Sequence, residues 1–182
     1  MEKLMVFGIL SLAALAISWR TIFNIYSHGF YRFFCWECIF WLFVSNCKYW
    51  FDDPLSTKQI FSWLCLFYSS YLLTSGLILM RKIGKPGNGR ANKTLYKFEK
   101  TSVLVQNGIF KYIRHPLCSS LLFFTWGLFL KNTTYSLFLV ALMSTVFIYL
   151  IAIFDERECM RVFGDQYSEY AKERKRFIPF VI

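Results

Sequence analysis

The sequence predicts an all-α, polytopic integral membrane protein with about five transmembrane helices. Of its 182 residues, 56% are hydrophobic and 21% are aromatic. Only 18% are charged, whereas a soluble domain usually carries about a quarter. A single soluble core of this size cannot hide so much apolar surface, so lipid is the expected solvent.

Five apolar segments approach the ~20 residues that a helix needs to cross a bilayer. They are Leu4–Trp19, Phe33–Phe51, Ile60–Met80, Leu117–Leu130 and Tyr135–Phe154. The first can extend past Arg20 to Tyr26. It also has features of a signal peptide, but four further spans follow it, and this favours a retained helix.

The last two segments are expected to form an antiparallel hairpin, because only residues 131–134 separate them. We therefore divide the chain into two parts. Residues 1–80 hold three N-terminal transmembrane helices. Residues 81–182 hold a cytoplasmic linker, the helical hairpin and a C-terminal cytoplasmic helix.

The basic residues predict the orientation in the membrane. With five spans, 17 of the 21 Lys and Arg residues fall on one face. This face is predicted to be cytoplasmic and to carry the C-terminus, with the N-terminus outside. We expect the endoplasmic reticulum in a eukaryote and the inner membrane in a bacterium. The net charge of +10 comes from these clusters, so it does not indicate nucleic-acid binding.

The six cysteines predict no metal site. Cys35 and Cys38 form a CxxC pair, but neither a second pair nor a nearby histidine accompanies it in the sequence. Small apolar residues packed in a bilayer are the simpler interpretation.

Candidate chemistry lies in two cytoplasmic stretches, residues 81–116 and 155–182, whose ends the hairpin brings together. Arg114 and His115 precede Pro116, which can start a helix at the membrane interface. If the fifth helix continues, Glu156 faces inward. The alternatives are that Arg114 is only a topology anchor and Glu156 only an exposed helix-end carboxylate.

These stretches together resemble the isoprenylcysteine carboxyl methyltransferase and phospholipid methyltransferase superfamily. The matching motifs lie between residues 104 and 180, in the right order and with hairpin-length spacing. They are Gly108-Ile109-Phe110, Arg114-His115-Pro116, Glu156, Phe163-Gly164, Tyr167, Tyr170 and Ile178-Pro179.

The resemblance implies an S-adenosylmethionine-dependent enzyme with cytoplasmic cofactor-binding segments. It implies a lipophilic or prenylated acceptor that arrives from the bilayer, most simply an isoprenylcysteine-like carboxylate. Arg114 and Glu156 match catalytic positions. The matched cofactor-binding positions are Leu104, Gly108, Phe110, Tyr112, His115 and Glu156. Membrane lipids are expected partners; nucleic acid is not.

Some residues depart from the family pattern. Cys118 stands where a tyrosine is usual, and Cys159 where a leucine is usual. Three alternatives therefore stay open: a phospholipid amine methyltransferase, an NADPH-dependent enzyme similar to sterol reductases, and a non-catalytic membrane adaptor. The sequence does not indicate the oligomeric state.

Overall fold

The computed structural model of the chain describes residues 2–85 and 101–179, and these residues are mainly helical. The prediction of an all-α fold is thus confirmed for the described residues. In chain order they form α1 (Glu2–Ser18), α2 (His28–Asn46), the 3-10 helix η1 (Cys47–Tyr49), α3 (Thr57–Lys82), the 3-10 helix η2 (Gly108–Lys111), α4 (Pro116–Lys131), α5 (Tyr135–Phe163) and α6 (Asp165–Glu173).

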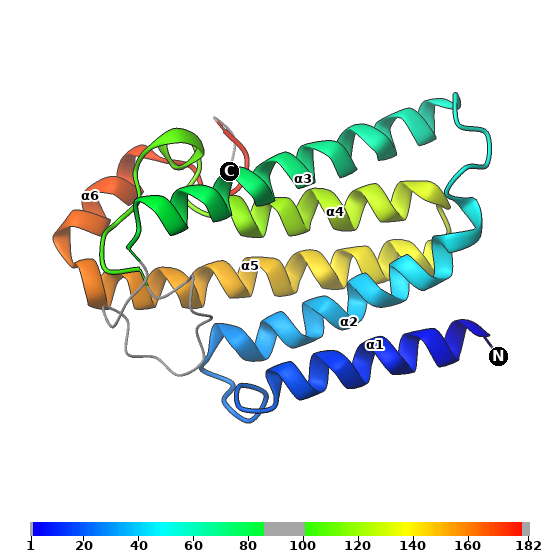
Figure 1. The fold of residues 1–182 in the computed structure, drawn as a ribbon, viewed down its shortest axis with the longest axis horizontal. Coiled ribbons are helices and arrows are strands. Elements are labelled where there is room, and N and C mark those ends of the chain that lie inside the picture. Colours follow the sequence, from blue (N-terminus) through cyan, green and yellow to red (C-terminus); the bar gives the residue numbers. More distant parts are fainter. Residues whose placement is uncertain (1, 86–100, 180–182) are drawn as a thin grey trace.

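The five long helices, α1 to α5, lie side by side and alternate in direction (Figure 1). The short helix α6 lies at one end of this bundle. The end of α3, the start of α4 and the end of α5 lie at the same end, which we call the α6 end. The alternating directions therefore bring together residues around 82, 116 and 163.

Helix α4 lies in the middle of the bundle and packs on α2, α3 and α5. Its contact with α3 is close because small residues face each other. A Cβ on Gly127 would lie 2.9 Å from Leu66 Cδ2. Two serines of α3 donate to carbonyls of α4: Ser62 to Gly127 at 2.7 Å and Ser69 to Ser120 at 2.7 Å. Small residues and interhelical hydrogen bonds of this kind hold helices together where lipid surrounds them.

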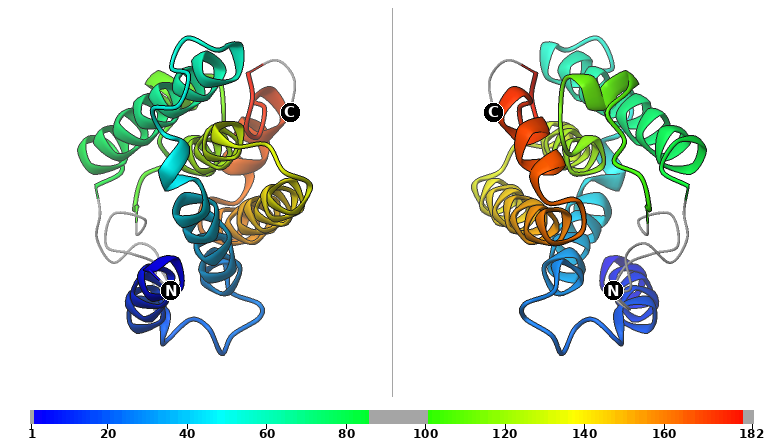
Figure 2. Two further views of the ribbon diagram at one scale, coloured as in Figure 1. Left: turned by 90° about the vertical axis from the view of Figure 1, so that its right-hand side faces the viewer. Right: turned by 90° about the vertical axis from the view of Figure 1, so that its left-hand side faces the viewer.

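Helix α1 packs mainly on α2 and lies at the side of the bundle (Figure 2). It ends at Ser18, whose carbonyl accepts from the backbone and the side chain of Thr21. The predicted extension of the first helix to Tyr26 is therefore wrong. Helix α2 begins at His28, five residues earlier than predicted, after Ser27 caps it by accepting from Gly29 N. It ends at Asn46 rather than Phe51, where the Asn46 side chain donates to Leu128 O at 2.7 Å.

The predicted hairpin of α4 and α5 is confirmed. Pro116 is the first residue of α4, and Thr134 caps α5 by accepting from Leu137 N. Helix α5 has 29 residues, nine more than the predicted apolar segment, so it spans about 43 Å at 1.5 Å per residue. A bilayer core is only about 30 Å thick. The charged last turns of α5 therefore extend beyond the apolar part toward the α6 end.

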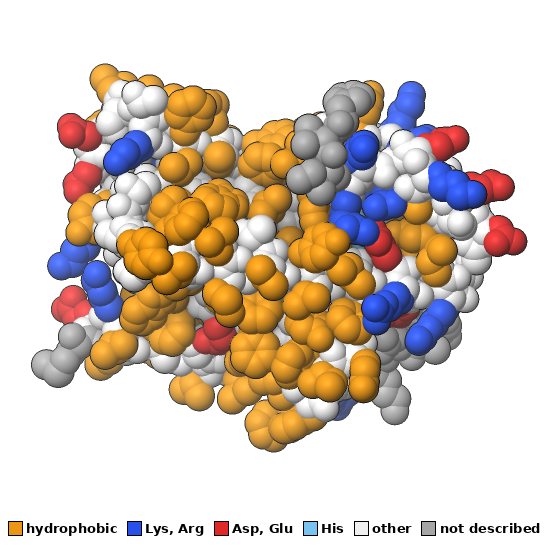
Figure 3. Space-filling model, turned by 180° about the vertical axis from the view of Figure 1, so that it is seen from behind, with side chains coloured by type: hydrophobic (Ala, Val, Ile, Leu, Met, Phe, Trp, Pro, Cys, Tyr) orange, Lys and Arg blue, Asp and Glu red, His pale blue; other side chains and the backbone are white. Residues whose placement is uncertain are grey.

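Two of the described helices, α3 and α5, are long and apolar enough to cross a membrane, and α4 is a shorter apolar helix of 16 residues. The arrangement with five spans stays a prediction. Large apolar side chains cover the middle of the surface, and charged side chains lie at both ends (Figure 3). Such a surface is rare on a soluble monomer and is typical of a protein in contact with lipid.

Candidate active site

The segment before α4 and the segment after α6 lie side by side at the α6 end. Ile113 and Lys175 form an isolated parallel β-bridge. Arg114 N donates to Lys175 O at 2.8 Å, and His115 N donates to Arg176 O at 3.2 Å. These backbone bonds fix the positions of Arg114, His115 and Arg176, although about 60 residues separate the two segments.

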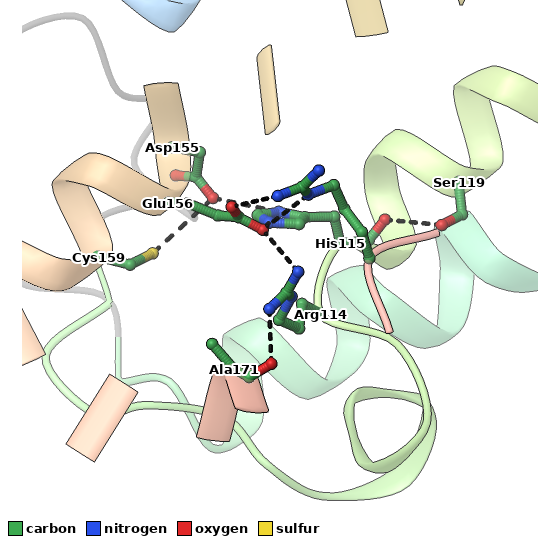
Figure 4. Close-up of polar contacts among 8 residues, drawn as sticks. Arg114, His115, Ser119, Asp155, Glu156, Cys159 and Ala171 are labelled. Carbon is green, nitrogen blue, oxygen red and sulfur yellow. Dashed lines mark hydrogen bonds and ion pairs between the residues drawn. The ribbon is translucent and has the colours of Figure 1, made fainter. Parts of the chain in front are cut away.

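Glu156, on the last turns of α5, is the centre of the charged cluster (Figure 4). Arg176 donates to both of its oxygens, from Nε to Oε1 at 3.0 Å and from Nη2 to Oε2 at 2.9 Å. On the other side, Arg114 Nη2 lies 3.2 Å and His115 Nε2 lies 3.1 Å from Oε1. One carboxylate thus joins three side chains from both segments.

His115 lies between two carboxylates. Its Nε2 faces Glu156, and its Nδ1 lies 3.5 Å from Asp155 Oδ2. Burial by itself lowers the pKa of His115, but the hydrogen bonds to Asp155 and Glu156 outweigh burial and raise this pKa above its usual value. The ring is therefore held toward its doubly protonated form, in which both nitrogens donate.

Arg114 points into the protein rather than toward lipid. Besides its ion pair with Glu156, its Nη1 donates to Ala171 O, near the end of α6, at 2.7 Å (Figure 4). Only 14% of its side chain is exposed. A topology anchor at the membrane surface places its charge in water or among headgroups. Arg114 instead connects α5 and α6.

A cavity of about 110 Å³ lies beside the charged cluster. Helix α5 contributes Ile151, Asp155, Cys159 and Phe163, which recur every four residues and so share one face. The remaining wall comes from α2, the end of α3, the segment 101–115, the start of α4, and α6. These wall residues are His28, Met80, Thr101, Leu104, Val105, Phe110, Arg114, His115, Pro116, Leu117, Cys118, Tyr167 and Tyr170.

The structure brings four of the proposed site residues into this wall: Leu104, Phe110, Arg114 and His115. Glu156 lies behind the wall, against Arg114 and His115, and Asp155 takes the inward position that the sequence assigned to Glu156.

Two other proposed cofactor-binding residues are not in the cavity wall. Gly108 has φ +59° and faces α3, where a Cβ on it would lie 2.7 Å from Leu79 Cδ1. Tyr112 is 50% exposed. Gly108 thus shapes the turn that carries Phe110 into the wall, as the Asn107-Gly108 pair predicts.

Two tyrosines of α6 complete the wall and differ in one respect. Tyr170 donates from Oη to Phe110 O at 2.7 Å, which joins α6 to η2. Tyr167 is only 3% exposed, and its Oη has no hydrogen-bond partner among the described residues. Burial raises the pKa of both phenols, so both stay protonated. Tyr167 therefore lines the cavity and carries a buried hydroxyl that has no partner among the described residues.

Asp155, Tyr167 and Arg176 were not among the predicted catalytic or cofactor-binding residues, although Tyr167 belongs to the matched motifs. Tyr167 and Tyr170 lie three residues apart on α6 and so share one face, and that face lines the cavity. No local pattern indicates Arg176, because its partner Glu156 lies 20 residues earlier, beyond a helix end and a turn.

Comparison with known proteins agrees with the motifs. A family model described as phospholipid methyltransferase matches residues 64–166, from within α3 to the start of α6. These are 103 of the 182 residues, more than half of the chain. No curated protein and no solved structure matched the chain.

Proposed function

This chain belongs to the phospholipid methyltransferase family, within the superfamily of membrane methyltransferases that includes the isoprenylcysteine enzymes, and on that premise we propose that it uses S-adenosylmethionine to methylate a lipophilic acceptor. One observation carries the proposal. Residues from three family motifs line one cavity: Phe110, Arg114-His115-Pro116 and Phe163, although more than 50 residues separate the first from the last.

The cavity suits the proposed methyl donor in its chemistry. This donor carries a positive sulfonium centre, an amino-acid end and an adenosine, and when bound it supplies an electrophilic methyl group. The wall offers the carboxylate of Asp155 toward positive charge, the Tyr167 hydroxyl as an unpaired donor, and Leu104, Phe110 and Phe163 as apolar contacts. At about 110 Å³, the cavity is smaller than the ~300–1,000 Å³ typical of a whole ligand site. The described wall therefore accounts for part of the donor's contacts.

A carboxylate acceptor is the first candidate. Its oxygen forms the new bond to the methyl carbon while the carbon–sulfur bond of the donor breaks, and no proton is released. Such a displacement depends on alignment and on the exclusion of water. Arg114 lies in the cavity wall with a guanidinium that attracts a carboxylate, and its bonds to Glu156 and Ala171 O hold it in place. Its proposed role is to orient the acceptor.

A phospholipid amine is the second candidate, and one observation favours it. Methylation of an amine releases one proton for each methyl group, so the site needs a proton acceptor. The side chains of Asp155 and His115 line the cavity and lie 3.5 Å apart. The Asp155 carboxylate can receive the proton, and the His115 ring next to it can hold this carboxylate in place.

The first test is binding of S-adenosylmethionine to detergent-purified protein, measured by calorimetry. S-adenosylhomocysteine and NADPH serve as comparison ligands. Micromolar binding of S-adenosylmethionine and S-adenosylhomocysteine, together with no binding of NADPH, supports the proposal. Binding of NADPH alone would instead assign the protein to the reductases, and binding of none of the three to well-folded protein would favour the adaptor.

The acceptor class is then distinguished with a radiolabelled methyl donor and two acceptors, a farnesylated cysteine derivative and phosphatidylethanolamine vesicles. A methyl ester releases volatile methanol in base, whereas an N-methyl lipid keeps its label. Label released from the cysteine derivative supports the carboxylate candidate. Label retained in the lipid fraction supports the amine candidate.

A further inference from the structure

A second pocket, of about 310 Å³, lies at the α6 end next to the cavity. We call it the basic pocket. It is lined by Arg114, Ala171, Lys172, Glu173, Arg174, Lys175 and Arg176. Five of these side chains are cationic, and among the described residues Glu173 in the wall and Glu156 behind it form ion pairs with them. The basic pocket therefore keeps an excess of positive charge.

The ion pairs do not use all the donors of the basic pocket. Arg114 Nε and Arg174 Nε are buried and have no hydrogen-bond partner among residues 2–85 and 101–179. Lys172 and Lys175 are exposed at the rim. A ligand with several acceptor oxygens and negative charge fits such a set of donors better than a neutral ligand does.

The basic pocket borders the apolar surface of the bundle. The guanidinium carbon of Arg176 lies 5.1 Å from the centre of the Tyr149 ring. Tyr149 is 44% exposed on α5, on the same apolar helix as the exposed Leu142 and Val146. Lys and Arg side chains also lie beside the apolar surface at this end in Figure 3. In a membrane, this boundary lies at the depth of the lipid phosphates.

We propose that the basic pocket binds the phosphate group of an anionic membrane lipid that is not the methyl acceptor. The phosphate of the lipid supplies the acceptor oxygens, and the acyl chains of the lipid lie along the apolar surface near Tyr149. The proposal depends on the membrane location of the family and not on the methyltransferase reaction. Because Arg114 lines both the basic pocket and the cavity, a lipid bound here contacts a residue of the candidate active site.

The test measures lipid binding to the purified chain in mixed micelles by native mass spectrometry. Dioleoylphosphatidylglycerol is compared with dioleoylphosphatidylcholine at equal mole fraction. The variant Lys172→Gln/Lys175→Gln removes two rim cations. The control Arg157→Gln/Arg161→Gln removes two exposed cations of α5 outside the pocket. Circular dichroism checks the fold of each variant, and Lys172→Arg/Lys175→Arg restores the charge.

We expect the wild type to prefer phosphatidylglycerol. The lysine variant should bind it roughly 25-fold more weakly, since each of the two basic residues near a membrane surface contributes about fivefold in affinity. The affinity of the control Arg157→Gln/Arg161→Gln for phosphatidylglycerol should stay within about twofold of the wild-type affinity. The variant Lys172→Arg/Lys175→Arg should bind this lipid like the wild type. Equal loss in both glutamine variants, or equal binding of the two lipids, would overturn the proposal. If millimolar inorganic phosphate stabilises the protein as much as the anionic lipid does, the basic pocket is a site for free anions, and the lipid proposal is overturned.

Discussion

Arg176 and Glu156 form a bidentate ion pair that joins the segment after α6 to the end of α5, with N···O distances of 3.0 and 2.9 Å. Both side chains are mostly buried, with 22% and 18% exposed. A planar guanidinium matches two carboxylate oxygens in a way that an ammonium does not. This pair is therefore expected to hold the C-terminal segment against the rest of the site.

Replacing Arg176 tests this role. Arg176→Ala should lower the free energy of unfolding by about 1.5–3 kcal/mol, the usual contribution of hydrogen bonds to charged groups, and Arg176→Lys should recover only part of it. The matched control is Arg174→Ala, because Arg174 pairs with the exposed Glu173, and exposed ion pairs contribute little. Denaturant unfolding in detergent gives both values, and equal losses would contradict the special role of Arg176.

Glu156 is the shared partner of three side chains, so its charge should matter more than its volume. Glu156→Gln keeps the shape but leaves Arg114, His115 and Arg176 without a shared anion. Misplaced groups of this kind cost about a hundredfold in turnover. We expect methyl transfer to fall by that factor while circular dichroism stays unchanged. Glu169→Gln, on the exposed face of α6, is the control, and full activity of Glu156→Gln would remove Glu156 from the site.

The raised pKa of His115 predicts a pH dependence of stability. A group whose pKa is higher in the folded protein stabilises the fold fully below its unfolded value of 6.5, and it loses that contribution as the pH rises through the folded pKa. The free energy of unfolding should therefore decrease above pH 6.5. His115→Gln should remove this part of the dependence, which unfolding curves from pH 5.5 to 8.5 will measure. An identical pH profile in the variant would contradict the prediction.

Tyr167 and Tyr170 provide a pair of opposite tests. Tyr170→Phe removes the hydrogen bond to Phe110 O and should cost about 1 kcal/mol of stability. Tyr167→Phe removes a hydroxyl that has no partner among the described residues, so stability should stay equal or rise slightly. If this hydroxyl serves the ligand, Tyr167→Phe should still weaken binding of S-adenosylmethionine about tenfold. Unchanged binding would assign Tyr167 a packing role only.

Alanine substitutions at two glycines with similar φ angles can separate the stability cost of backbone strain from that of poor packing. Gly108 has φ +59° and Gly164 has φ +54°, but only at Gly108 does a Cβ meet another side chain, Leu79 Cδ1 at 2.7 Å. Gly164→Ala should cost about 1–3 kcal/mol from strain alone. Gly108→Ala should cost more and should also disturb the cavity through Phe110. Thermal unfolding together with ligand binding will separate the two effects.

The arrangement of the helices could be predicted well because it depends on long apolar segments and short connections. The hairpin follows from the short connection between α4 and α5, which has three residues, and the closeness of Arg114 and Glu156 follows from the hairpin. The ends of α2 could not be predicted in this way. They depend on the Ser27 cap and on the bond from Asn46 to Leu128 O, across 82 residues.

The site was predicted best where the chain carries a motif and less well where tertiary contacts decide. Phe110 and His115 lie in the cavity wall, as the motif suggests. Asp155 lines the cavity, whereas Glu156 pairs with Arg114, His115 and Arg176. Adjacent residues on a helix point about 100° apart, so Asp155 and Glu156 cannot both face the cavity. The sequence of α5 alone does not show which of the two does.

The parallel bridge between Ile113 and Lys175 also has a consequence for the order of events during synthesis. All five long helices are complete by residue 163. The backbone N–H groups of Arg114 and His115, however, donate to the carbonyls of Lys175 and Arg176. A growing chain that has already formed the five long helices therefore still lacks these two backbone bonds, which form only after residues 175 and 176 have been made.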